Sequence, residues 1–202
     1  MKNIGLDFDN TLVLYDQIFY DYALEKNLIP NNIGKSKKSV RDFLLKNNQE
    51  EIFTEMQGVI YGELIYDAPV QKDLRENLYK LINHGYKISI ISHKTKYPIK
   101  GKKIDLHKSA LDWLINNKFL DKDIVGIEEK NIFFEDTLEK KIKKINELKC
   151  DIFIDDLHKV LNLLNPSIHK ILFCNKESLL ENLVDIKIIN DWNEIYKEIL
   201  NI

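Results

Sequence analysis

The sequence contains few cysteines, carries little net charge and has no long apolar run. Its 202 residues include two cysteines, Cys150 and Cys174, too few for a disulfide framework or a zinc site. The formal net charge of -2 offers no basic excess for binding nucleic acid or an anionic membrane surface. No apolar stretch reaches the length of a membrane span, and we find no signal peptide. We therefore expect a cytoplasmic protein without nucleic-acid or membrane partners.

The composition and periodicity of the chain are typical of a soluble α/β domain. Hydrophobic residues make up 44% and charged residues 31% of the sequence, as in ordinary globular proteins. Apolar strand-like runs alternate with helix-like segments from residue 69 onward. The strands are expected at 87–92, 132–134, 151–154, 170–173 and 184–189. This alternation favours a mostly parallel sheet with helices on both faces.

A helical block separates the first expected strand from the rest of the sheet. The first strand is expected at 3–8, and residues from about 16 to 66 show apolar residues mostly at helical spacing. Asn31, Asn32 and Gly34 mark a break within this block. We therefore expect a helical insert directly after the first strand.

Paired acids follow two of the expected strands. Asp7 and Asp9 come at the end of the first strand and share one side of an extended segment. Asp155 and Asp156 follow strand 151–154. A turn or helix cap explains either pair alone. Because the carboxyl ends of parallel strands form a common crevice, the pairs together favour a shared cation site, of the kind that magnesium occupies beside a substrate phosphate.

Two further segments could hold phosphate oxygens. Ser92 ends strand 87–92 and is followed by His93 and Lys94. The helix expected at 137–148 is rich in lysine, and one of its lysines could neutralise phosphate and the acidic cluster. The sequence leaves open which lysine does so; the candidates are Lys140, Lys141 and Lys143.

These four pieces, in this order, resemble the four motifs of the haloacid dehalogenase superfamily. The segment Asp7-Phe8-Asp9-Asn10-Thr11 matches the first motif, DxDx[TV], in full. Ser92 resembles the second motif, Lys141 is our choice for the third, and Asp155-Asp156 resembles the fourth. The resemblance implies a Rossmann-like core of residues 1–14 and 67–202. It also implies a small helical cap of residues 15–66 over the crevice.

The resemblance also implies a role for each site residue. Asp7 would be the nucleophile and Asp9 the general acid and base. Magnesium would be held by Asp7, the backbone carbonyl of Asp9, Asp155 and Asp156. The expected contacts to phosphate or substrate are Asn10, Thr11, Ser92, His93, Lys94 and Lys141. Further candidate substrate contacts are Glu55, Gln57, Tyr61 and Tyr66 in the cap, and Lys96, Lys100, Lys102, Lys103, Asp105 and His107 after Ser92.

The function expected on this basis is Mg²⁺-dependent hydrolysis of a small polar phosphomonoester. The substrate would be a sugar phosphate, an amino-alcohol phosphate or a nucleoside phosphate. We expect the protein to act as a monomer or homodimer. The superfamily's dehalogenases and P-type ATPases do not carry an Asp at the position that corresponds to Asp9. By this resemblance, Asp9 favours a phosphatase. A phosphotransferase or mutase on the same scaffold is one alternative. A receiver-like signalling module is another. The large insert and the position of Asp7 after the first strand argue against a receiver.

Overall fold

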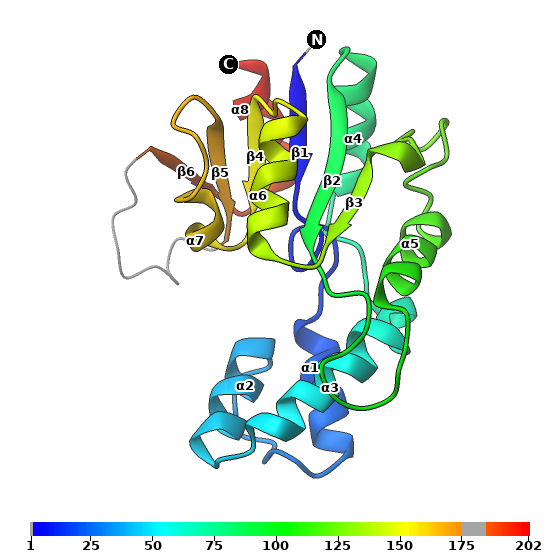
Figure 1. The fold of residues 1–202 in the computed structure, drawn as a ribbon, viewed down its shortest axis with the longest axis vertical. Helices are drawn as coiled ribbons and strands as arrows, with labels where there is room; N and C mark the ends of the chain where they lie inside the picture. Colours follow the sequence, from blue (N-terminus) through cyan, green and yellow to red (C-terminus); the bar gives the residue numbers. More distant parts are fainter. Residues whose placement is uncertain (1, 175–184) are drawn as a thin grey trace.

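The computed structural model describes residues 2–174 and 185–202, and within them six parallel strands form one sheet (Figure 1). The spatial order is β3-β2-β1-β4-β5-β6. The strands are β1 (Asn3–Leu6), β2 (Lys87–His93), β3 (Ile132–Glu135), β4 (Ile152–Asp155), β5 (His169–Phe173) and β6 (Ile186–Ile189). The expected α/β, Rossmann-like fold is therefore confirmed. The order reverses between β1 and β4, so a ligand crevice is expected beyond their carboxyl ends.

Two layers of helices cover the sheet. The helices after the insert are α4 (Leu74–Asn83), α5 (Leu106–Asn116), α6 (Leu138–Glu147), α7 (His158–Leu161) and α8 (Trp192–Leu200). In Figure 1, α6 and α7 lie in front of the sheet and α4 and α8 lie behind it. Alternation along β4 explains the two layers, since Ile152 and Ile154 join one apolar cluster and Phe153 joins the other. Both faces of the sheet are thus buried, as a parallel sheet requires.

The strand β1 contains a glycine because a side chain from β4 fills the space beside it. A Cβ on Gly5 would lie 2.5 Å from Cδ2 of Phe153. The glycine lets the central strand pair closely with β4 on one side and β2 on the other. This pairing fixes the position of the residues that follow β1.

The helical insert lies beyond the carboxyl ends of the strands (Figure 1). It contains α1 (Asp16–Glu25), α2 (Lys37–Lys46) and α3 (Glu50–Gly62), followed by the short helix η1 (Ile65–Asp67). A Cβ on Gly58 of α3 would lie 2.9 Å from Cβ of Pro98, so α3 packs tightly on the segment that follows β2. The division into a core of 1–14 and 67–202 and a cap of 15–66 stays a prediction.

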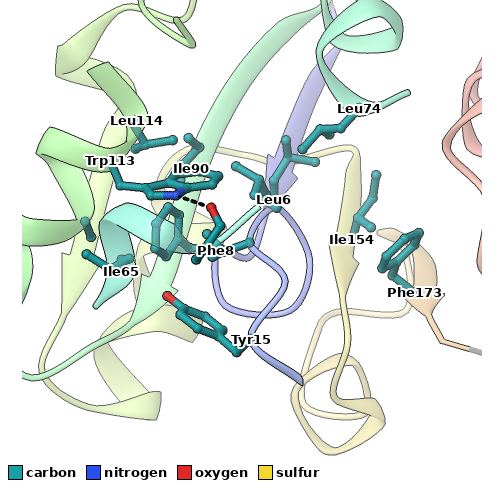
Figure 2. Packing of buried hydrophobic residues seen from close by; sticks show 14 of the residues in the cluster. Leu6, Phe8, Tyr15, Ile65, Leu74, Ile90, Trp113, Leu114, Ile154 and Phe173 are labelled. Carbon is teal, nitrogen blue, oxygen red and sulfur yellow. Dashed lines mark hydrogen bonds between the residues drawn. The ribbon is translucent and has the colours of Figure 1, made fainter. Parts of the chain in front are cut away.

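A buried aromatic cluster joins the end of the insert to the sheet. Figure 2 shows Trp113 beside Phe8, and their ring centroids lie 5.5 Å apart in an edge-to-face arrangement. The indole N–H of Trp113 donates to the carbonyl oxygen of Ala68 at 2.8 Å.

Within the described residues, no helix combines the length and apolarity that a membrane crossing needs.

Candidate active site

Asp7, Lys141 and Asp155 meet at the carboxyl end of the central strands. Asp7 follows β1 directly, Asp155 ends β4, and Lys141 stands in the first turn of α6. The Lys141 Nζ donates to Asp7 Oδ1 and to Asp155 Oδ2, each at 2.6 Å. All three side chains are buried. Burial disfavours the charge on Lys141, but the Asp7 and Asp155 carboxylates raise its pKa above the ordinary value.

The position of Lys141 follows from the start of α6. Thr137 caps the helix, and its side-chain oxygen accepts a hydrogen bond from the Lys140 backbone N–H. Lys140 and Lys143 point elsewhere, because they pair with Asp136 and Glu147 on the exposed face of the helix. Of the three lysines that the sequence left open, Lys141 is the one whose Nζ lies between the acids.

A group of carboxylates that could hold a metal surrounds this lysine. One oxygen each of Asp7, Asp155 and Asp156 lies within 4.8 Å of the other two. Burial, followed by the charge of Asp7, raises the pKa of Asp155 to about 8 and the pKa of Asp156 to about 7. Asn10 orients Asp156, since its Nδ2 donates to Asp156 Oδ2 at 3.0 Å. Oxygen ligands that repel one another are the donor set that a hard divalent cation stabilises.

The Asp9 carboxylate faces away from this group and is held by two other side chains. The Tyr15 hydroxyl donates to Asp9 Oδ1 at 2.8 Å, and burial followed by the charge of Asp9 keeps the pKa of Tyr15 well above its usual range. The Lys94 Nζ lies 3.0 Å from Asp9 Oδ1 and 2.9 Å from Oδ2. The contact of Lys94 with substrate stays a prediction; in the structure its ammonium group pairs with Asp9.

The remaining residues expected to bind phosphate differ in their positions. Ser92, near the end of β2, lines a cavity of about 340 Å³ together with Asp7, Asp9 and Lys141. His93 lines the same cavity, and its Nε2 lies 3.2 Å from the carbonyl oxygen of Asp136. The Thr11 side chain is fully buried and is not among the residues that line this cavity, so the phosphate contact expected of it stays a prediction.

The insert contributes a cation that sequence reasoning missed. Lys37, at the start of α2, is half-buried and lines the 340 Å³ cavity together with Asp7, Asp9 and Asp156. Its Nζ lies 5.4 Å from the centre of the Tyr61 ring. Burial opposes its charge, but Tyr61, Asp9 and Asp156 raise the pKa of Lys37 above the ordinary value. A lysine at a helix start gives no sequence signal for this position, because only the placement of the insert brings it to the site.

A second cavity of about 160 Å³ adjoins the first between α3 and the segment that follows β2. Asp9, Gln57, Tyr61 and His93 line both cavities. The second cavity is further lined by Thr54, Gly58, Lys94, Thr95, Pro98, Ile99 and Leu106. Asp9 therefore stands between a charged cavity and a smaller, largely uncharged one.

Several other candidate contacts lie outside both cavities. Glu55 is exposed on α3, and Tyr66 donates to Asp112 on α5. Lys100 and Lys102 form ion pairs with Glu51 and Glu63 of α3. The other loop candidates, Lys96, Lys103, Asp105 and His107, line neither cavity.

The arrangement combines the groups that phosphoryl transfer to a carboxylate requires. Asp7 is a buried carboxylate with one oxygen held by Lys141, and a nucleophile of this kind can accept a phosphoryl group. Lys141 and Lys37 both bring positive charge to the lining of the larger cavity. Asp9 can exchange a proton with a group that occupies both cavities.

Structural comparison identifies proteins with the same fold. A predicted phosphatase from Clostridium acetobutylicum superimposes with a TM-score of 0.64 at 16% identity, over 100% of this chain and 99% of that one. A HAD-superfamily hydrolase from Ehrlichia chaffeensis gives 0.57 at 14% identity, over 100% and 98%. A dehalogenase gives 0.53 at 10% identity, over 98% and 96%. The chain therefore has the haloacid dehalogenase superfamily fold.

Sequence comparison adds one relative without a described activity. An uncharacterized protein from Dictyostelium discoideum is 24% identical over 204 residues, which cover 94% of this chain and 72% of that protein. No family model matches the chain.

Proposed function

We propose that the protein is a phosphomonoester hydrolase that forms a phosphoryl intermediate on Asp7. The observation that carries this proposal is the contact between Asp7 Oδ1 and the Lys141 ammonium group, with Asp155 on the far side of the lysine. The buried lysine fixes the nucleophile and balances charge beside it. The fold alone does not decide the reaction, because a dehalogenase shares it.

The proposed reaction has two displacements. In the first, an Asp7 oxygen attacks phosphorus and the bond to the ester oxygen breaks, while Asp9 gives that oxygen a proton and the alcohol leaves. In the second, water attacks phosphorus, its proton passes to Asp9, and the bond to Asp7 breaks to release phosphate. Splitting the reaction in this way replaces one difficult step by two easier ones. A positioned acid and base contributes about 100- to 10,000-fold to such a rate.

The acidic group fits a magnesium ion. Asp7, Asp155 and Asp156 supply carboxylate oxygens within 4.8 Å of one another, and burial followed by the negative charge of Asp7 raises the pKa values of Asp155 and Asp156. The backbone carbonyl of Asp9 is the further ligand that we propose. When bound, magnesium would neutralise charge on the phosphoryl oxygens. Lys141 supplies one positive charge to the same cluster, and Asn10 orients Asp156.

The smaller cavity supports a substrate with a small, uncharged leaving group. Its volume of about 160 Å³ is less than half the 340 Å³ of the larger cavity. Thr54, Gln57 and Tyr61 offer polar groups on its wall. Its one lysine, Lys94, is already paired with Asp9. We therefore favour the phosphate ester of a short polyol or small sugar over a nucleoside phosphate or an ester with an anionic leaving group.

Steady-state phosphate release tests the proposal. Wild-type protein with Mg²⁺ should hydrolyse p-nitrophenyl phosphate and glycerol 1-phosphate, and should lose both activities in EDTA or as the Asp7→Asn variant. Phosphoglycolate and a nucleoside monophosphate should be poorer substrates than glycerol 1-phosphate by kcat/KM. Phosphate release that survives Asp7→Asn would contradict the proposed nucleophile. Transfer to an added alcohol without phosphate release would favour the phosphotransferase, and a stable phosphorylated protein without turnover would favour the signalling module.

A further inference from the structure

The cation beside Asp9 is the ammonium group of Lys94, a lysine whose side chain is buried. The Lys94 side chain is 3% exposed, and its Nζ contacts both oxygens of Asp9, at 3.0 and 2.9 Å. Its Nζ also lies 4.6 Å from the centre of the Tyr61 ring and 5.5 Å from that of Phe8. A buried ammonium group of this kind is costly unless it is paired, so the pair with Asp9 accounts for its presence.

The backbone of Lys94 is held equally firmly. Its N–H donates to the carbonyl oxygen of Glu135 at 2.9 Å, at the end of β3. Its carbonyl oxygen accepts from Nε2 of His107 at 2.7 Å, at the start of α5. The ammonium group is therefore carried by a rigid part of the sheet edge. A lysine in a solvated loop would position Asp9 less accurately.

Lys94 lies on the leaving-group side of Asp9. It lines the smaller cavity, whereas the larger cavity with Asp7, Ser92 and Lys141 is lined without it. Within the described residues, Lys94 forms no hydrogen bond or ion pair with Asp7, Ser92 or Lys141. Its geometry fits a role that acts through Asp9.

We propose that Lys94 is a positioning residue that aims the Asp9 carboxylate at the oxygen of the leaving group. This inference rests on the proposed function. Tyr15 and Lys94 both contact Oδ1, whereas Oδ2 has the single contact to Lys94 among the described residues. Oδ2 is thus the oxygen that exchanges the proton with the leaving alcohol. Tyr15 and Lys94 together fix the rotation of the carboxylate about its Cβ–Cγ bond.

The role predicts an effect that depends on the leaving group. An alkoxide needs a proton as it leaves, whereas p-nitrophenolate leaves readily without one. Loss of a correctly aimed acid should therefore lower the rate for alkyl esters by about 100-fold or more and the rate for p-nitrophenyl phosphate much less. A loss of overall structure would lower both rates equally.

The experiment compares kcat/KM, which reports the first displacement and not the shared hydrolysis of the intermediate, for glycerol 1-phosphate and p-nitrophenyl phosphate in the Lys94→Met variant. This variant keeps the approximate length of the side chain but removes the ammonium group. We expect about a 100-fold loss with the alkyl ester. We expect a loss below about fivefold with the aryl ester, and the same contrast in Asp9→Asn. Lys94→Arg should recover part of the alkyl-ester rate. Lys96→Met is the matched control, because Lys96 lies in the same segment and pairs with Asp105 at 3.7 Å.

Three outcomes decide the question. A selective loss with the alkyl ester supports the inference, and an equal loss with both esters, or none, overturns it. If Lys94→Met does not fold by circular dichroism, Lys94→Gln, which is polar but uncharged and one bond too short to reach Asp9 in the same way, is compared instead. Failure of the wild-type protein to hydrolyse either ester would instead reject the proposed function itself.

Discussion

Replacement of Lys141 by methionine removes the cation that separates two buried carboxylates. The Lys141 Nζ contacts Asp7 and Asp155 at 2.6 Å each, and the three side chains are 2%, 7% and 0% exposed. Breaking a buried ion pair by removing one partner costs about 3–5 kcal/mol of folding free energy. We expect a loss of this size in the metal-free Lys141→Met protein at pH 9, which lies above the pKa of about 8 that Asp155 has in the intact protein.

The loss should shrink as the pH falls. Burial and the charge of Asp7 raise the pKa of Asp155 to about 8, whereas an unfolded Asp titrates near 3.9, as a rough reference value. Between these pH values the folded protein binds more protons than the unfolded chain, so its stability falls as the pH rises. Removing Lys141 raises the pKa of Asp155 in the folded protein further, so the fall in stability continues above pH 8. At pH 6, where Asp155 already holds a proton, we expect a loss of about 1–2 kcal/mol from the missing hydrogen bonds.

Urea unfolding in EDTA at pH 6 and pH 9, followed by tryptophan fluorescence, measures both losses. The matched control is Lys143→Met on the same helix, because Lys143 is 78% exposed and should leave the unfolding free energy unchanged. A Lys141→Met loss below about 1 kcal/mol at pH 9, or one that grows as the pH falls, would refute the reasoning.

Three further changes test other parts of the structure. Lys37→Met should raise KM for p-nitrophenyl phosphate by about 10-fold, because a cation facing the phosphate cavity is lost; an unchanged KM would argue against this contact. Gly58→Val should lower the stability in thermal unfolding by about 1–3 kcal/mol, since a Cβ there already meets Pro98 at 2.9 Å. Trp113→Phe should cost about 1–3 kcal/mol in urea unfolding because the Ala68 carbonyl loses its donor, and an unchanged midpoint would contradict this.

The sequence was sufficient to predict the sheet and most of its helices. Strong local signals explain this success: the apolar run Ile88–Ile91 matches β2, and Thr137 caps α6 as its residue type suggests. The first strand was expected to extend to residue 8 but ends at Leu6, so Asp7 and Asp9 lie in the turn that follows it. Part of the strand expected at 184–189 lies outside the described residues, and β6 covers Ile186–Ile189.

The site was less accessible to sequence reasoning because its contacts span distant segments. Asp7 follows β1 and Asp155 ends β4, and these strands are adjacent and parallel, so the proximity of the two acids follows from strand order. The pairing of Lys94 with Asp9 could not be anticipated, since a lysine after a strand usually faces solvent. Lys37 was missed for a different reason. It belongs to the insert, and no local pattern specifies how the insert faces the sheet.

Identification of the phosphorylated residue tests the central claim most directly. Wild-type protein mixed with Mg²⁺ and ³²P-labelled p-nitrophenyl phosphate, whose leaving group does not need the acid, is quenched in acid within milliseconds, digested and mapped by mass spectrometry. We predict an alkali-labile phosphoryl group on Asp7, which accumulates further in Asp9→Asn because Asp9 no longer activates water. Label on another residue, or rapid phosphate release without any label on Asp7, would contradict the account.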